Sequence, residues 1–282
     1  MKPKFKSYIK GRKKFSHIIY KKNGYRAVIT INREKKLNCL DLTTITELTT
    51  AFKDASWDDD ISVIILTGAG RRAFSTGADL DEQQEYFLGN PADYYKWMYE
   101  FIQLHEVMRN VGKPTIARLN GMTVGGGNEL NMSCDLAIAA DHVIIRQVGA
   151  ARGSVAAAGA TQFLPLLVGD RRAREILFLC EEIPAERALE WGLVNQVVPY
   201  DRLDEAVEIM AEKLHHKLPE CLRYAKQHLN FWRDLSWHTT IGHARDWLAI
   251  HNLSAEVKEG ISSFNKKKRP DYEKIRKGYG KK

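Results

Sequence analysis

The sequence lacks an apolar run of the roughly 20 residues that a membrane-spanning helix needs. It also lacks an N-terminal apolar segment followed by a small-residue cleavage site, so we expect no export signal. Its four cysteines are widely spaced and none stands in a CxxC pair. These absences predict a cytoplasmic protein with reduced thiols in or near its core.

Acidic side chains are absent from residues 1–33, which hold eleven Lys and Arg. Residues 266–282 hold nine Lys and Arg against two acids, whereas residues 34–265 hold 23 basic and 33 acidic side chains. The formal charge of +8 therefore comes from two basic ends around an acidic body. Such ends bind nucleic acid, stay solvated or serve a phosphorylated ligand. Because no nucleic-acid-binding motif accompanies them, we expect no nucleic-acid partner.

The order of the predicted elements favours an α/β fold. Apolar runs typical of strands cover 26–32, 62–68, 113–121 and 135–145. Residues 42–52 carry a helical stripe, with Asp41 as the expected N-cap. A strand, a helix and a further strand in this order indicate buried parallel pairing. After 185–199 the pattern becomes helical, with stripes in 204–214, 220–232 and 240–253.

The change of pattern suggests two regions. We assign residues 1–203 to a core, with a basic extension at 1–22, and residues 204–282 to a helical region. The helical region carries apolar side chains that one core need not consume, namely Ile241, Ala244, Leu248 and Ile250. This surplus favours an oligomer.

Two small-residue loops attract attention as possible sites. Residues 125–127 are three glycines between a strand and a predicted helix, and "AFSTGADL" at 73–80 follows another strand. Glycine lets a backbone N–H approach a ligand, and a helix N-terminus favours negative charge. Two such loops can supply one N–H each to an oxyanion. The alternative interpretation is a tight turn or close helix–sheet packing.

In combination, four motifs resemble the crotonase (enoyl-CoA hydratase/isomerase) superfamily. They are "AFSTGADL", "KPTIARLNGMTVGGGNELNMSCDLAIAA", "GATQFLPLLVG" and "AERALEWGLVNQVVP". The resemblance implies a ClpP-like spiral of ββα units and a C-terminal helical trimerisation region, hence a homotrimer or homohexamer. It also implies an acyl-CoA thioester as substrate, whose carbonyl oxygen meets the N–H groups of Ala78 and Gly126. No cofactor is implied beyond the coenzyme A moiety of the substrate.

The hydratases that this chain resembles carry Glu two residues after GGG, here Glu129, and a second Glu where this chain has Gly149. Glu129 is thus the candidate acid or base, although a carboxylate here can also cap its own helix. Within this superfamily the sequence resembles 6-oxocyclohex-1-ene-1-carbonyl-CoA hydrolases. That similarity rests on "GNPADYYKWM", "NGMTVGGGNEL", "GATQFLPLLVG" and "LPECLRYAKQHL".

The same resemblance implies a set of substrate-binding residues. The CoA moiety is expected to meet Lys35, Lys36, Ser75, Thr76, Gly77 and Asp79, with Lys266–Lys268 as further phosphate ligands. The acyl group and its water are expected near Tyr99, Gly149, Thr161 and Gln162. Tyr86, Tyr94 and Tyr95 are alternative sources of a hydroxyl group, and each can equally belong to an aromatic helix face. Each lysine can equally be a solvated surface charge. His105 and His142 have no partners at metal-ligand spacing, so we expect no metal.

Three functions remain open at this point. The first is the addition of water to an enoyl- or oxo-acyl-CoA, as a hydratase or a ring-opening hydrolase. The second is an enoyl-CoA isomerase that moves a proton through Glu129. The third is a non-catalytic relative that binds CoA or RNA.

Overall fold

The computed structural model describes residues 14–156 and 158–279, and it contains two mixed sheets covered by helices. The larger sheet has the order β1-β2-β3-β5-β7-β10, in which only the β1–β2 pair is antiparallel. The smaller sheet has the order β4-β6-β8-β9, in which only the β8–β9 pair is antiparallel. The strands are Ile18–Asn23, Arg26–Ile31, Val63–Gly68, Ala73–Ser75, Thr115–Leu119, Met122–Val124, Leu136–Ala140, Ile144–Arg146, Ile183–Pro184 and Gln196–Val198, numbered β1 to β10 in that order.

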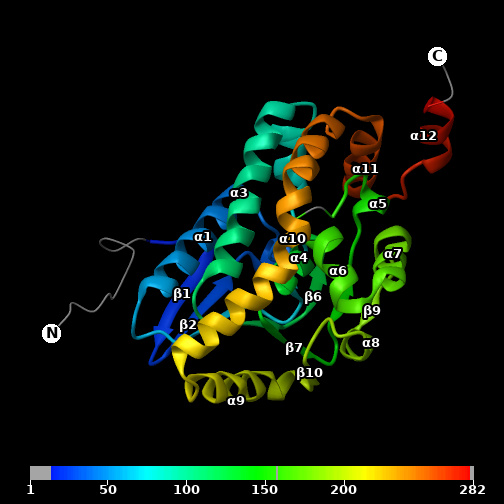
Figure 1. Cartoon of the computed structure of the whole chain (residues 1–282). Coiled ribbons are helices and arrows are strands. Elements are labelled where there is room, and N and C mark those ends of the chain that lie inside the picture. Colours follow the sequence, from blue (N-terminus) through cyan, green and yellow to red (C-terminus); the bar gives the residue numbers. More distant parts are fainter. Residues whose placement is uncertain (1–13, 157, 280–282) are drawn as a thin grey trace.

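Each turn of the chain contributes one strand to each sheet and then a helix. Strands β3 and β4 are followed by α2 and α3. Strands β5 and β6 are followed by α4, and strands β7 and β8 by α5. The helices of this part are α1 (Leu42–Trp57), α2 (Leu80–Glu82), α3 (Pro91–Asn110), α4 (Gly126–Ser133), α5 (Gly149–Arg152), α6 (Ala160–Val168), α7 (Asp170–Leu179) and α8 (Ala185–Glu190). Short 3-10 turns cover Glu34–Lys36 and Tyr200–Arg202, and a π-turn covers Gln83–Phe87. The arrangement is the predicted spiral of ββα units (Figure 1).

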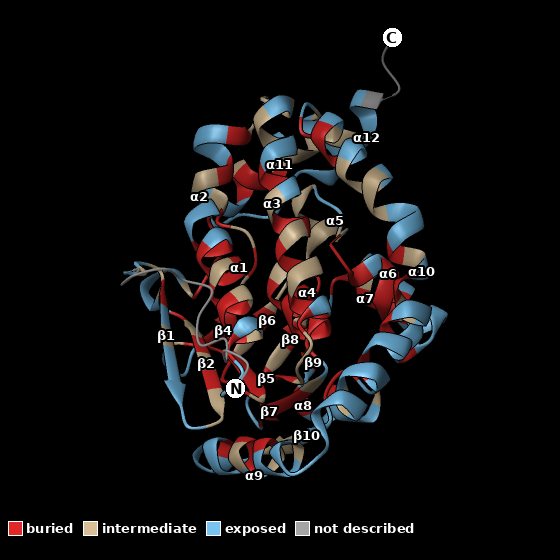
Figure 2. Ribbon diagram, turned by 60° about the vertical axis from the view of Figure 1, so that its left-hand side comes forward, coloured by how far each residue is buried: buried red, intermediate tan, exposed pale blue. Residues whose placement is uncertain are grey.

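Local sequence explains where the main helices begin. The Asp41 side chain accepts a hydrogen bond from the N–H of Thr44 at 2.7 Å and caps α1, as predicted. Helix α3 begins with Pro91 after Asn90, whose side chain accepts from the N–H of Asp93. The residues of α1 and α3 that face the sheet are buried. The inner strands β3, β5 and β7 of the larger sheet are almost wholly buried, whereas the edge strand β1 is mostly exposed (Figure 2).

The C-terminal region consists of α9 (Leu203–His215), α10 (Pro219–His251), α11 (Ala255–Asn265) and α12 (Tyr272–Tyr279). Helix α10 crosses the molecule beside α3 and α6 (Figure 1). Its Trp237 is fully buried, and the Trp237 ring stacks on Phe163 with centroids 5.7 Å apart. Helix α11 packs against α5. The helical region therefore completes the core of its own chain.

The structure refines several predicted elements. The run at 135–145 divides into β7 and β8, which belong to different sheets. The stripes at 220–232 and 240–253 are parts of one helix, α10. The last residues of the predicted extension at 1–22 form most of β1, whereas residues 1–13 lie outside the described part. Three of the four cysteines are buried and Cys221 is exposed. Within the described ranges, no helix is both long and apolar enough to cross a membrane.

Candidate active site

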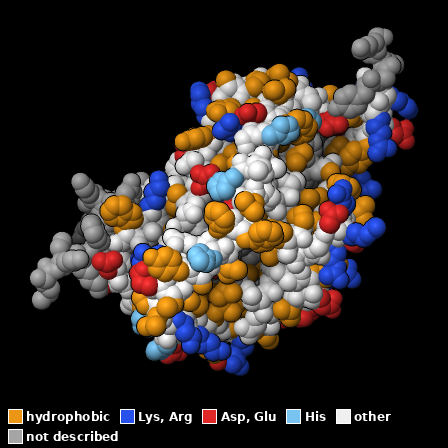
Figure 3. Space-filling model, viewed as in Figure 1, with side chains coloured by type: hydrophobic (Ala, Val, Ile, Leu, Met, Phe, Trp, Pro, Cys, Tyr) orange, Lys and Arg blue, Asp and Glu red, His pale blue; other side chains and the backbone are white. Residues whose placement is uncertain are grey.

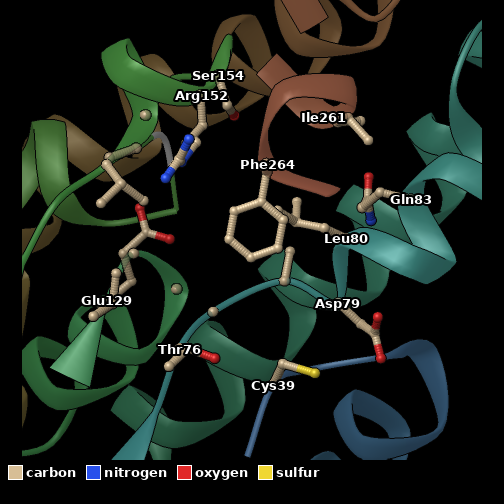
Figure 4. Close-up of a pocket in the computed structure, with 18 of the residues that line it drawn as sticks. Cys39, Thr76, Asp79, Leu80, Gln83, Glu129, Arg152, Ser154, Ile261 and Phe264 are labelled. Carbon is tan, nitrogen blue, oxygen red and sulfur yellow. The ribbon is translucent and has the colours of Figure 1, made fainter. Parts of the chain in front are cut away.

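A cavity of about 520 Å³ opens where the two predicted loops meet the C-terminal helices. Its floor contains Ala78 from the first loop and Gly126 and Glu129 from α4. Its wall contains residues of α3, of the segment from Gln147 to Ala158 and of α11 (Figure 4). Parts of the chain that are far apart in the sequence thus enclose one space.

The two loops touch through their backbones. A Cβ atom on Gly77, where φ is +80°, would lie 2.8 Å from the nitrogen of Gly126. On the other side of the first loop, Leu40 pairs with it as a short parallel bridge: the Leu40 N–H donates to the Gly77 carbonyl at 2.8 Å, and the Asp79 N–H donates to the Leu40 carbonyl at 3.0 Å. Ala78 lies between Gly77 and Asp79, the two residues that bond to Leu40. In a parallel bridge of this kind the N–H of the middle residue points away from the partner segment, here from Leu40.

The N–H groups of Ala78 and Gly126 have no acceptor among residues 14–156 and 158–279. Gly126 is the first residue of α4, so its N–H has no partner within the helix. Both residues line the cavity. Two unused donors and a helix N-terminus therefore border the same space, which suits an oxygen that becomes negative.

Each of the three glycines has its own structural reason. Gly125 has φ of +54°, a backbone conformation that favours glycine. A Cβ on Gly126 would lie 3.3 Å from the Gly77 Cα, and a Cβ on Gly127 would lie 2.1 Å from the Ser75 carbonyl oxygen. The close-packing interpretation therefore holds for Gly127, while Gly126 stands at the cavity.

Glu129 is the buried acid of the cavity, with 4% of its surface exposed. Its Oε1 accepts a hydrogen bond from the N–H of Ala158 at 3.0 Å, and the Ala160 N–H also stabilises the carboxylate. Burial nevertheless outweighs these contacts and raises the pKa of Glu129 to about 7. The carboxylate binds the beginning of α6 rather than its own helix, which contradicts the self-capping interpretation.

The other carboxylates of the cavity wall have basic partners. Asp79 pairs with Arg33 at 2.8 Å, Glu182 with Arg146 at 3.7 Å, and Asp81 with Lys36. Asp79 also caps α2, and the pKa of its carboxyl is below its usual value: burial opposes this, but the hydrogen bonds from Arg33 and its neighbours prevail. In the described part of the chain, Glu129 is thus the cavity carboxylate without a basic partner at ion-pair distance.

Tyr94 on α3 lines the same cavity. Its hydroxyl has no hydrogen-bond partner within residues 14–156 and 158–279. Burial raises the pKa of Tyr94, and the negative charge of Glu129 raises it further. The phenol therefore remains protonated at neutral pH and is close enough to Glu129 to feel its charge.

Gly149 begins α5 and borders the cavity, as expected. A Cβ atom at this position would lie 2.8 Å from the carbonyl oxygen of Ser154. The small residue is therefore required by the packing of the loop, and the wall has no carboxylate there.

Most of the predicted site residues lie together. The cavity is lined by Lys35, Lys36, Thr76, Gly77, Ala78, Asp79, Gly126, Glu129 and Gly149. Among the predicted residues that do not line it are Ser75, Tyr99, Thr161 and Gln162. The alternatives Tyr86 and Tyr95 and the stretch Lys266–Lys268 do not line it either.

The reasons differ. Ser75 is fully buried in β4, and Tyr99 lies on the exposed side of α3, facing away from Tyr94. Gln162 caps α6 by accepting from the N–H of Gly159 at 3.2 Å, and its amide donates to Thr240. Thr161 is exposed and donates to Gln162.

The sequence did not reveal the contribution of α5 and α11. Arg152, Ile261 and Phe264 line the cavity, although none of them was predicted as a site residue (Figure 4). Of the two histidines predicted to be structural, His105 is buried and contacts the Ser133 hydroxyl at 2.7 Å, and burial lowers the pKa of His105 to about 3. His142 contacts the Arg71 carbonyl oxygen at 3.1 Å. Among residues 14–156 and 158–279, no three His, Cys, Asp or Glu side chains are grouped to hold a metal.

A model of the enoyl-CoA hydratase/isomerase family matches residues 22–276. The chain belongs to this family. It is similar to the enoyl-CoA hydratase of Bacillus anthracis, with 31% identity, a TM-score of 0.74 and coverage of 91% of this chain and 99% of that one. It is also similar to an enoyl-CoA hydratase/isomerase of Xanthobacter autotrophicus Py2, with 27% identity, a TM-score of 0.83 and coverage of 90% and 94%.

The chain also shares its fold with an enoyl-CoA hydratase of Mycobacterium avium subsp. paratuberculosis. The TM-score is 0.83 at 24% identity, and the match covers 92% of this chain and 99% of that one. The α/β crotonase fold with a C-terminal helical region, which the sequence predicted, is confirmed.

Proposed function

We propose that this crotonase-family protein adds water to an enoyl- or oxo-acyl-CoA. The observation that carries the proposal is the position of Glu129, buried without a basic neighbour beside the two unused N–H groups of Ala78 and Gly126. The thioester carbonyl oxygen accepts hydrogen bonds from both N–H groups. They stabilise the negative charge that this oxygen gains in the transition state.

Glu129 performs the proton transfers in this proposal. Its carboxylate takes a proton from a water molecule while the oxygen of that water bonds to the β-carbon. The electron pair of the double bond shifts toward the carbonyl carbon and that of the carbonyl group moves to the thioester oxygen. The enolate then collapses as Glu129 returns to the α-carbon the proton that it took from water. A pKa of about 7 suits a group that both accepts and donates a proton at neutral pH. The Tyr94 hydroxyl, which stays protonated, holds the water in place.

The size of the cavity favours a bulky acyl group, although Gly149 itself leaves no extra space, because a Cβ there would lie 2.8 Å from the Ser154 carbonyl oxygen. Where the resembling hydratases have a second Glu, the wall here is glycine, and the cavity is of about 520 Å³. A ring-shaped oxo-acyl group, opened by the addition of water, fits the similarity to 6-oxocyclohex-1-ene-1-carbonyl-CoA hydrolases.

An isomerase is the second candidate, because a single carboxylate with a pKa of about 7 can carry a proton from one carbon to another. Incubation with enoyl-CoA esters in heavy water separates the candidates by mass spectrometry. Water addition increases the mass by one water, whereas isomerisation exchanges carbon-bound hydrogen without that increase. A protein that binds the esters and does neither is the non-catalytic relative, and that result would overturn the proposal.

The CoA moiety is expected to bind at the exposed edge of the cavity. Lys35 and Lys36 lie there, and Lys36 pairs with Asp81. The basic stretch Lys266–Lys268 follows Phe264, which lines the cavity, and is a further candidate for phosphate binding, in its own chain or in a neighbouring subunit.

We further propose a homotrimer or a homohexamer. Large apolar side chains are exposed along α10, namely Leu229, Phe231, Trp232, Leu235, Trp247 and Ile250. Figure 3 shows hydrophobic side chains gathered on the face that α10 crosses. Monomeric proteins rarely expose so many large apolar groups together. Only part of the apolar stripe predicted for the oligomer is available on this surface. Ile250 is exposed, whereas Leu248 is buried in its own chain.

A further inference from the structure

Arg152 brings a positive charge to the wall of the cavity. Its side chain is half-buried and its guanidinium lies over the Phe264 ring, 5.1 Å from the centroid. With residues 14–156 and 158–279 it forms no ion pair and no hydrogen bond through its side chain. Figure 4 shows the guanidinium extending into the cavity on the side of the Glu129 carboxylate.

Close backbone packing fixes the position of this arginine. A Cβ on Gly260 of α11 would lie 2.0 Å from the Arg152 carbonyl oxygen. A Cβ on Gly153 would lie 2.3 Å from the carbonyl oxygen of Glu256. The two glycines let α5 and α11 meet without side chains between them, so the guanidinium stem starts from a rigid junction.

The charge has no counter-charge inside the described part of the cavity. The wall carboxylates Asp79, Asp81 and Glu182 are paired with other basic groups, and Glu129 lies beyond ion-pair distance of Arg152. A partly buried guanidinium without a partner costs free energy, which an anionic ligand group would offset.

We infer that Arg152 binds a carboxylate at the far end of the acyl group. The inference rests on the proposed function, in which the thioester lies at Ala78 and Gly126 and the reacting carbons lie at Glu129. The rest of the acyl chain then continues into the space that Arg152 borders. A planar guanidinium binds a carboxylate through two parallel hydrogen bonds, and the Phe264 ring lies beside it, with its centroid 5.1 Å from the guanidinium carbon. Within the proposed addition of water, this narrows the substrate class to the CoA monothioester of an unsaturated dicarboxylic acid, in place of the uncharged ring that the resemblance suggests.

Binding of unreactive esters tests this without turnover. We would measure by calorimetry the affinities of hexanoyl-CoA and 5-carboxypentanoyl-CoA, which differ only in a terminal methyl or carboxylate. The wild type is expected to bind the carboxylate ester about 10- to 100-fold more tightly. Arg152→Gln is expected to lose this preference and Arg152→Lys to retain part of it. Arg174→Gln, which removes an exposed arginine from α7, serves as the matched control.

Free CoA distinguishes the alternatives. Unchanged affinity of Arg152→Gln for free CoA shows that the variant is folded and supports the inference. If Arg152→Gln weakens free CoA and both esters equally, the arginine binds a CoA phosphate and the inference is wrong. Equal affinity of the wild type for both esters overturns it as well, while acyl-CoA binding itself survives. If neither ester nor free CoA binds, the proposed function fails too.

Turnover supplies a second readout. The preference of the wild type for 5-carboxypent-2-enoyl-CoA over hex-2-enoyl-CoA in kcat/KM should disappear in Arg152→Gln, with the loss confined to the carboxylate substrate. An equal fall for both substrates would contradict a role in acyl-group selection.

Discussion

The Oε1 atom of Glu129 accepts a hydrogen bond from the N–H of Ala158 at 3.0 Å, which joins α4 to the segment that precedes α6. The contact holds the acid at the cavity without an ion-pair partner. The backbone donors that fix its position lower the pKa of Glu129, and burial outweighs them and raises it.

Glu129→Gln preserves the shape of the side chain and removes its ability to exchange protons. We expect turnover of acyl-CoA substrates to fall about 10²- to 10⁴-fold, while binding of unreactive CoA esters is retained. Steady-state kinetics and calorimetry on the same preparation check this. Parallel losses of binding and turnover would point to a structural role for Glu129.

The same substitution should stabilise the protein at alkaline pH. Folding raises the pKa of Glu129 from 4.5 to about 7, so the folded state keeps a proton that the unfolded chain releases. The free energy of unfolding therefore decreases as the pH rises from about 4.5 to 7, by up to about 3 kcal/mol.

The free energy of unfolding of the Glu129→Gln variant does not decrease in this way. The difference between variant and wild type in this free energy should therefore shift in favour of the variant by about 2 kcal/mol from pH 5 to pH 8. Denaturant unfolding at one protein concentration measures it. A difference that does not change with pH would show that Glu129 titrates normally in the folded state.

Gly126→Val should reduce turnover at least about 10²-fold, comparable to the loss of one oxyanion donor. A Cβ on Gly126 would lie 3.1 Å from the Phe101 ring and 3.3 Å from the Gly77 Cα, so the branched side chain separates the two loops. The control is Gly242→Val on α10, where a Cβ meets nothing within 4 Å. A folded Gly126→Val protein with full activity would remove Gly126 from the proposed site.

The wild type should hydrate crotonyl-CoA poorly, because one carboxylate performs the work for which the resembling hydratases carry two. Gly149→Glu should not restore the activity, since its Cβ would lie 2.8 Å from the Ser154 carbonyl oxygen. Loss of absorbance of the conjugated thioester follows this reaction directly. Rapid hydration by the wild type would mean that another group replaces the second carboxylate.

Substitutions of exposed apolar residues on α10 test the proposed oligomer. Phe231 and Trp232 are 78% and 71% exposed, and a glutamate at either position should dissociate the proposed trimer. Light scattering at micromolar concentration gives the molar mass. Ile209→Glu, which alters an exposed apolar residue on α9, should leave the assembly intact. A monomeric wild type would refute the oligomer.

Sequence patterns predicted the elements whose signals are local. The runs at 26–32 and 62–68 correspond to β2 and β3, and the Asp41 cap was visible because capping depends on neighbouring residues. Strands β4, β6 and β8 have three residues each, too few for a period-2 pattern. The sequence therefore showed one sheet of the spiral more clearly than the other.

The residues of the site also differ in how far the sequence predicted them. The loops at Ala78 and Gly126 carry motifs, and the structure brings them together. Tyr94 and Tyr99 both lie on α3, and helical spacing alone does not say which side faces the cavity. Arg152 and Phe264 meet through tertiary packing between α5 and α11, for which no local pattern exists.

The backbone contact between Gly153 and Glu256 has a consequence for biosynthesis. More than a hundred residues separate α5 from the helix that closes the cavity beside it. During translation the N-terminal part of a chain emerges and begins to fold first. The sheets of this protein can therefore form on the ribosome while the cavity is still open to water, and a chain that stops before α11 would lack its wall.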